Sequence, residues 1–315
     1  MMLPRRHRRT EPRRLQRGFT MIEAVIVIVI TGIIAAMVAI FIQAPVQSYL
    51  DSRDRADLVN EAGTAIRRMR IDLRLALPNS IRSYESGGFQ YLELLLTKTG
   101  GRYQSVDDGL GLAGSLSFTD ASNTSFSYIG PVLSGAQAIN PGDAIVLFNL
   151  GDGFQPADAY EGGNRAYVAS VAGASITLVA NPYPATVDNS SGTSSVSPLD
   201  NSYHRFQVVT TPVTYRCANG ASGAAAGTLV RYWDYQIAAT QPASVAALAL
   251  QDANRPLVVP KNALLTADVA SCGFDYLVQA NRRSALVGLH LSLAKQAGNG
   301  GTVSLFDQVH VDNTP

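Results

Sequence analysis

Residues 18–42 read GFTMIEAVIVIVITGIIAAMVAIFI. From Ala24 to Ile42 the chain has no charged residue, and these 19 residues would span roughly 28 Å as a helix. That length is close to the hydrocarbon thickness of a bilayer. The many β-branched residues lower helix propensity in water, but an unpaired backbone group in lipid costs several kcal/mol and enforces the helix. The segment therefore predicts a single membrane-spanning helix.

A basic leader precedes this apolar run. Residues 1–18 hold seven arginines and one glutamate, a formal charge of +6, which leaves −5 for the rest of a chain whose total is +1. Basic residues beside a membrane span stay cytoplasmic, so we expect the N-terminus in the cytoplasm and the body outside it. An acidic body argues against a nucleic-acid partner. The apolar run is too long for a secretory signal peptide, and Arg13-Arg14 lacks the bulky residues that follow a twin-arginine signal.

Glu23 does not fit a segment that serves only as a membrane anchor. It lies at the start of the apolar run, four residues after Phe19. A carboxylate in or near lipid is costly and usually has a partner. Glu23 either sits at headgroup level in contact with water, or neutralises a charge inside a bundle of apolar helices, where desolvation penalises an unpaired group.

The helical pattern continues beyond the membrane. Pro45 can kink the helix, because it removes one backbone hydrogen bond. Further on, apolar residues recur every three or four positions and predict an amphipathic helix with one face on a core and a solvated charged face. Pro78-Asn79 predicts its end. The apolar positions are Leu58, Ala62, Ile66, Met69, Leu73 and Leu77.

Beyond Ser80 the pattern changes to short strands separated by turns. A short helix is expected at 243–253, and the last two strands are expected to form a C-terminal hairpin. The predicted strands are 90–97, 116–128, 144–150, 166–172, 175–180, 204–211, 228–236, 273–279, 285–293 and 302–311.

The two cysteines, Cys217 and Cys272, lie in no CxxC motif and no Cys/His cluster. If the body lies outside the cytoplasm, a disulfide is the natural interpretation. It would close a loop of roughly 55 residues and stabilise the fold by on the order of 4 kcal/mol. The alternative is two unpaired buried thiols.

The run Gly18-Phe19-Thr20-Met21-Ile22-Glu23, behind a basic leader and ahead of the apolar segment, resembles the prepilin cleavage motif of type IV pilins and type II secretion pseudopilins. The resemblance implies that a membrane peptidase cuts after Gly18 and that the new terminal Phe19 becomes N-methylated. It also implies that Glu23 pairs with the free amine of a neighbouring subunit in a filament. Met21 stands where many members have Leu, a conservative apolar change.

Within that class, two stretches, Gln43–Tyr49 and Leu73–Ser80, resemble the O-protein family of MSHA-type pilus systems, and so does the C-terminal run from Cys272–Tyr276 to Val309–Asn313. That family is similar to J-type minor pseudopilins and W-type minor pilins. It implies an α+β fold, with a long N-terminal helix packed on an antiparallel β-rich domain. The expected division is a cleaved leader at 1–18, a transmembrane and filament-core helix at 19–44, its amphipathic continuation at 45–79 and a β-rich extracytoplasmic domain at 80–315.

The function expected from this resemblance is a minor, non-enzymatic pilus subunit of the bacterial inner membrane, with the β-domain in the periplasm. Its partners would be prepilin peptidase, other pilin subunits and the assembly machinery. The same residues support equally well the alternative that the chain is a minor pseudopilin of a type II secretion system. A signal-anchored periplasmic enzyme or binding protein is a more remote alternative.

No catalytic residue, cofactor or metal site is expected. Gly109–Gly114 satisfies GxGxxG, but no strand precedes it and no helix is expected after it. His290 and His310 alternate with apolar residues, as partly buried structural histidines do. Four oxygen-bearing residues share one turn-rich stretch, where a solvated turn is a better interpretation than a Ca²⁺ site. They are Asn149, Asp152, Asp158 and Glu161.

Overall fold

The computed structural model describes residues 18–106, 114–184, 187–188, 194–195, 199–200, 203–220, 227–276, 284–295 and 301–314. By its internal contacts the chain divides into two compact units, Met1–Ser52 and Arg53–Pro315. One long helix is followed by an antiparallel β-rich region, so the fold class is α+β with a helix packed on a sheet, as predicted.

Helix α1 runs from Met21 to Arg74 and is not broken at Pro45. It ends three residues before the predicted Leu77, because the following residues pair with a strand. The Leu77 N–H donates to the Leu95 carbonyl at 2.8 Å, and the Thr97 N–H donates to the Leu75 carbonyl at 2.8 Å. A backbone committed to a strand ladder cannot also continue the helical i to i−4 pattern.

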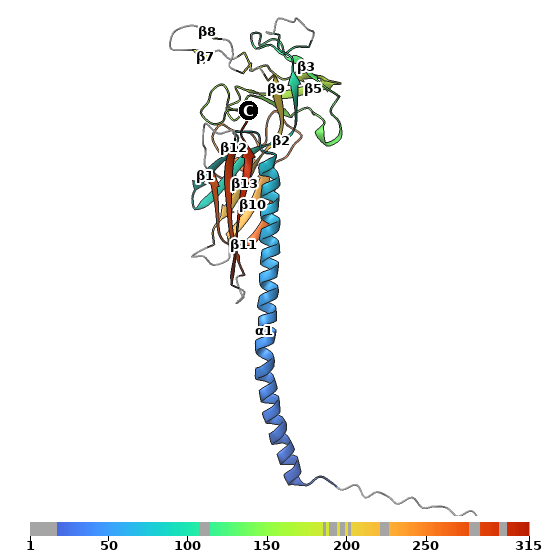
Figure 1. Ribbon diagram of the computed structural model, residues 1–315, viewed down its shortest axis with the longest axis vertical. Coiled ribbons are helices and arrows are strands. Elements are labelled where there is room, and N and C mark those ends of the chain that lie inside the picture. Colours follow the sequence, from blue (N-terminus) through green and yellow to red (C-terminus); the bar gives the residue numbers. More distant parts are fainter. Residues whose placement is uncertain are drawn as a thin grey trace, which may run out of the picture. The chain divides into compact units, whose positions relative to one another are not determined.

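In the second unit, α1 packs on a sheet of antiparallel strands (Figure 1). The pairings give the order β1-β2-β9-β10-β11-β12-β13. The strands are β1 Arg82–Ser86, β2 Phe89–Tyr103, β9 Arg205–Ala218, β10 Gly227–Trp233, β11 Lys261–Tyr276, β12 Ser284–Ala294 and β13 Thr302–Asp312.

The predicted apolar face of the amphipathic helix is confirmed. Its residues are buried and pack against side chains that alternate along the strands, as the period of two in a strand requires. On β12 these alternate residues are Val287, Leu289, Leu291 and Leu293. The helix residues buried against the sheet are Leu58, Ala62, Ala65, Ile66, Met69 and Leu73.

The long strands β2 and β9 also take part in a second structure, a closed barrel. The pairings run from β2 to β3, β6, β5, β4 and β9 and return to β2. Closure leaves no free strand edge in the ring. An aromatic core that includes Phe126 against Phe206 fills it. The added strands are β3 Ser125–Ile129, β4 Ala144–Leu147, β5 Arg165–Ala172 and β6 Ser175–Leu178.

Several predicted elements differ from the structure. The strand expected at 116–128 is reduced to β3, and Leu116 makes only an isolated bridge to Ser105. The helix expected at 243–253 is a single 3-10 turn, η3 Ala247–Ala249, because this segment instead covers the sheet face opposite α1 with Leu248. The remaining short elements are η1 Gly135–Gln137, β7 Val187–Asp188 and β8 Ser194–Ser195.

Strand β1 was not predicted, and β11 begins 12 residues before the predicted start at Gly273. The C-terminal hairpin of β12 and β13 is confirmed, with Ala294 opposite Thr302. Most of the GxGxxG motif falls outside the described residues.

Candidate processing and assembly site

The start of α1 is organised by Thr20. Its hydroxyl oxygen accepts a hydrogen bond from the Glu23 N–H at 3.4 Å, and its carbonyl accepts one from the Ala24 N–H at 3.2 Å. Thr20 and Glu23 have the spacing of a capping box, in which a threonine satisfies a backbone donor that the first helical turn leaves free. Glu23 also places a negative charge in the first turn, where the helix dipole favours it.

The Gly18–Phe19 peptide lies just before the helix and is exposed. A Cβ built on Gly18 meets no atom within 4 Å, and Phe19 is 78% exposed. An exposed backbone outside regular structure is what a peptidase requires. Glu23 is exposed as well, and it forms no ion pair with any residue that the structure describes.

The apolar segment of α1 is exposed along its length in the isolated chain. In the described part of the chain, one helix, α1, is long and apolar enough to cross a membrane, and none of its most apolar stretch is buried. The hydroxyl of Thr31 donates to the Val27 carbonyl at 2.7 Å, so this polar group is satisfied within the helix. An exposed apolar surface of this size requires cover by lipid or by neighbouring helices.

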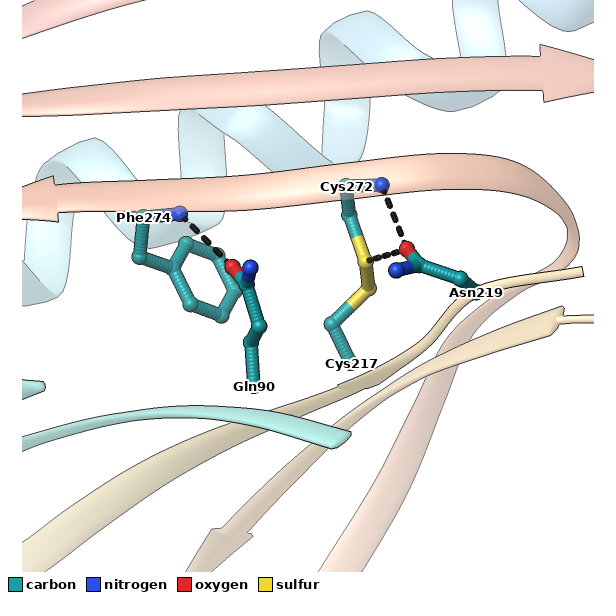
Figure 2. Close-up of a disulfide and its surroundings, with 5 residues drawn as sticks. All are labelled: Gln90, Cys217, Asn219, Cys272 and Phe274. Atoms are coloured by element: carbon teal, nitrogen blue, oxygen red, sulfur yellow. Dashed lines mark hydrogen bonds between the residues drawn. A yellow bond between two sulfur atoms is a disulfide. The ribbon is translucent and has the colours of Figure 1, made fainter. Parts of the chain in front are cut away.

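The two cysteines are joined by a disulfide. Cys217 lies on β9 and Cys272 on β11, two strands that β10 separates in the sheet order. Figure 2 shows two side-chain amides beside the bond. The Asn219 carbonyl oxygen accepts from the Cys272 N–H at 2.9 Å, and that of Gln90 accepts from the Phe274 N–H at 3.1 Å. These amides satisfy N–H groups of β11, a role that no local pattern in the sequence indicated.

A buried carboxylate links α1 to the sheet, and the sequence reasoning missed it. Asp72 is 1% exposed, and one of its oxygens accepts from Arg231 Nε and from the Tyr215 hydroxyl, each at 2.7 Å. Arg68 lies 3.1 Å from the other oxygen. Burial, together with the neighbouring Asp72 carboxylate, raises the pKa of the Tyr215 hydroxyl. The signal was present, because Asp72 lies three residues after Met69 and hence on the core face.

A second buried carboxylate, Glu93 on β2, lies on the opposite face of the sheet. It accepts from Arg82 Nε at 2.6 Å and from the Tyr235 hydroxyl at 2.7 Å. Complete burial raises the pKa of the Glu93 carboxyl above its ordinary value despite the adjacent Arg82 guanidinium. Arg82 also stacks over the Tyr160 ring at 3.6 Å and donates to the Ala238 carbonyl at 2.8 Å. This network holds the loop after β10 against β1 and β2.

The structure brings together the stretches Leu73–Ser80 and Val309–Asn313, which the sequence analysis singled out. Asn79, which has a left-handed backbone with φ of 59°, donates through its side chain to the Asn313 carbonyl at 3.1 Å and to the Asn149 carbonyl at 2.9 Å. Asn tolerates this conformation better than most residues. Asn79 therefore links the end of the helical segment by hydrogen bonds to the residues after β13 and to the loop after β4.

The candidates for enzymatic or metal chemistry have structural roles or lie apart. Asn149 and Asp158 are buried and hydrogen-bonded to backbone groups, so the prediction of a solvated turn is wrong for these two residues. Among the described residues, no three possible metal ligands cluster. His290 and His310 are exposed rather than partly buried, and His290 lies 3.4 Å from Asp275 and stacks on Phe306.

Comparison with known proteins gives one match. Residues 13–39 match the family model described as the prokaryotic N-terminal methylation motif. No curated protein and no solved structure is significantly similar to the chain. The matched range includes three of the basic residues before Gly18 (Arg13, Arg14 and Arg17), the Gly18–Glu23 run and most of the apolar segment. The chain therefore carries, at the head of its long helix, the N-terminal methylation motif of type IV pilin-like proteins.

Proposed function

We propose that this chain is a minor pilin, a structural and non-enzymatic subunit of a type IV pilus of the MSHA type. The observation that carries the proposal is the N-terminal methylation motif placed at the start of a helix whose apolar stretch is fully exposed. The proposed parts are a leader at 1–18, a transmembrane and filament-core helix at 19–44, an amphipathic continuation at 45–79 and an extracytoplasmic domain at 80–315.

In this proposal prepilin peptidase cuts between Gly18 and Phe19, and the new Phe19 amine is methylated. Exposure of both residues and their position outside the helix support the cleavage. Removal of the leader also removes its charge of +6, which would otherwise have to enter an apolar bundle at high desolvation cost. Glu23 then pairs with the Phe19 amine of a neighbouring subunit, an interaction that its lack of an ion pair among the described residues leaves available.

Before assembly, the subunit is proposed to reside in the bacterial inner membrane with its N-terminus in the cytoplasm and its β-domain in the periplasm. The basic leader supports this orientation. On assembly the residues of the 19–44 helix exchange lipid for the helices of other pilin subunits. Small residues within the run, such as Gly32 and Ala36, allow helices to approach closely. The Cys217–Cys272 disulfide suits an oxidising periplasm.

Intact-mass and N-terminal analysis of the membrane-extracted protein tests this proposal. The expected product begins at Phe19 and carries one added methyl group. A chain that still begins at Met1 in cells with an active prepilin peptidase would contradict the proposal and leave a signal-anchored domain. The same analysis in cells without the peptidase is the control and should return the uncut chain.

A minor pseudopilin of a type II secretion system would give the same processed product. Gene deletion separates the two roles. We expect loss of surface pili with protein secretion intact. Loss of secretion with normal pili would assign the subunit to the secretion machine instead.

A further inference from the structure

An open groove with a volume of about 720 Å³ lies where the barrel strands pass the end of the helical segment. Its walls come from β2 and β9, from the residues that follow α1, and from the end of β13. We call it the basic groove, because four cationic residues and one acidic residue line it. These are Arg74, Lys98, Arg102, Arg205 and Asp312.

The groove contains an unfavourable pair of charges. Arg102 on β2 is directly opposite Arg205 on β9 in the antiparallel register, and both are exposed. Residues directly opposite each other have Cβ atoms about 5 Å apart, and like charges in such a pair destabilise the sheet. Among the residues that the structure describes, neither arginine forms an ion pair with an acidic side chain, so nothing there offsets this repulsion, which points to a role in binding.

The other charges of the groove do not cancel the pair. Lys98 is already engaged with Asp143 at 2.6 Å. Within the described part of the chain, no acidic side chain forms an ion pair with Arg74, Arg102 or Arg205. Arg74 lies in the last turn of α1, where the helix dipole favours a cation. That structural explanation covers Arg74. The Arg205 guanidinium lies over the Tyr203 ring, 6.0 Å from its centroid, which is the outer limit of a cation–π contact. This contact does not neutralise its charge, and it does not involve Arg102.

The two strands that carry the arginines approach each other closely. A Cβ added to Gly100 would lie 2.7 Å from the Phe206 carbonyl oxygen, and one added to Gly101 would lie 2.6 Å from the Phe206 ring. Only glycine permits this close approach of β2 to β9. The two guanidinium groups are therefore carried on a closely packed part of the barrel, so binding would cost little reordering of the backbone.

We propose that the basic groove binds a short acidic segment of another protein, whose carboxylates pair with Arg102 and Arg205. Planar guanidinium groups bind carboxylates through paired, charge-assisted hydrogen bonds. A nucleic-acid strand fits less well, because such proteins combine a long basic track with exposed stacking aromatics. Two aromatic residues line this groove and neither is exposed, since Phe206 is buried and Phe148 is half-buried. The proposal does not depend on the type of filament.

The test uses the full chain in neutral detergent and fluorescein-labelled hexaglutamate, with binding followed by fluorescence anisotropy. We expect salt-sensitive binding that the double variant Arg102→Gln/Arg205→Gln weakens by about tenfold or more. The matched control, Arg53→Gln/Arg67→Gln, removes two exposed charges that do not line the groove and should bind as the unmodified protein does. The Arg102/Arg205 variant should also melt no lower than the unmodified protein, because it removes a repulsion.

Four outcomes would overturn the proposal. One is the absence of hexaglutamate binding to the unmodified protein, and another is an equal loss in the control variant. The third is binding of a short single-stranded oligonucleotide in preference to hexaglutamate, which would assign the groove to nucleic acid. A lower melting temperature of the Arg102/Arg205 variant would show that the two arginines stabilise the barrel, and would remove the reason for a binding role.

Discussion

At the scale of single residues, the body depends on a carboxylate that lies between its helix and its sheet. Asp72 is almost fully buried, and two of its hydrogen-bond partners, Arg231 and Tyr215, come from different strands. Arg231 is itself 6% exposed, so its charge has little access to water. Removing one partner of a buried ion pair costs more than the pair contributes, because the remaining charge is left unpaired.

We therefore expect Asp72→Ala to lower the free energy of unfolding by about 3–5 kcal/mol. Urea unfolding of the full chain in detergent, followed by near-ultraviolet circular dichroism, measures it. Asp57→Ala on the exposed side of the same helix is the control and should change stability by less than about 0.5 kcal/mol. Replacing both charges, in Asp72→Leu/Arg231→Met, should recover much of the loss. An Asp72→Ala variant as stable as the control would contradict this account.

Glu23 is the second residue with a specific prediction. Glu23→Ala should still insert in the membrane and be cut after Gly18, because neither step uses the carboxylate. It should fail to enter filaments, since the Phe19 amine of a neighbour would stay unpaired in an apolar bundle. Immunoblots of sheared filaments and of membranes measure how much of the variant is assembled and how much remains in the membrane. Normal amounts in filaments would contradict the pairing, and Glu85→Ala in the exposed strand β1 should assemble normally.

At the scale of elements, the disulfide ties β9 to β11 across the end of β10. The bonded residues are 55 positions apart in the chain. Replacing both cysteines by serine should lower the free energy of unfolding by on the order of 4 kcal/mol, because the unfolded chain regains the entropy of an open loop. Urea unfolding with and without reductant measures the effect.

The double serine variant is also the control for the reductant, because it should not respond to it. A stability unchanged by either treatment would show that the side-chain amides of Asn219 and Gln90 hold this edge of β11 without the disulfide.

At the scale of the whole molecule, buried tyrosines couple stability to alkaline pH. Burial raises the pKa of six tyrosine hydroxyls above the ordinary value near 10. In the folded state these groups keep their protons as the pH rises through that value, whereas the unfolded chain releases them. They are Tyr160, Tyr167, Tyr183, Tyr215, Tyr235 and Tyr276.

A raised folded-state pKa gives a stability contribution that is complete below the unfolded pKa and is lost as the pH rises above it. We expect the melting temperature to fall steeply above about pH 10. About 1.4 kcal/mol should be lost per pH unit for each of the four fully buried tyrosines, Tyr160, Tyr183, Tyr215 and Tyr235. Thermal scans across this range measure the fall, and tyrosinate absorbance should show that the buried group ionises only on unfolding. Ionisation of all 13 tyrosines in the folded protein near pH 10 would contradict the expectation.

The membrane-length helix, the basic residues before it, the methylation motif and the α+β class could all be predicted from the amino-acid sequence. These features are local, because a membrane span and a sequence motif are each defined by consecutive residues. The buried face of the helix was also predictable, since its spacing follows the helical period. The closed barrel, the strand residues Arg231 and Tyr215 that pair with Asp72, and the opposition of Arg102 and Arg205 come only from the three-dimensional structure. Each depends on strand register between residues far apart in the chain, and a shift of one residue would move every side chain to the other face.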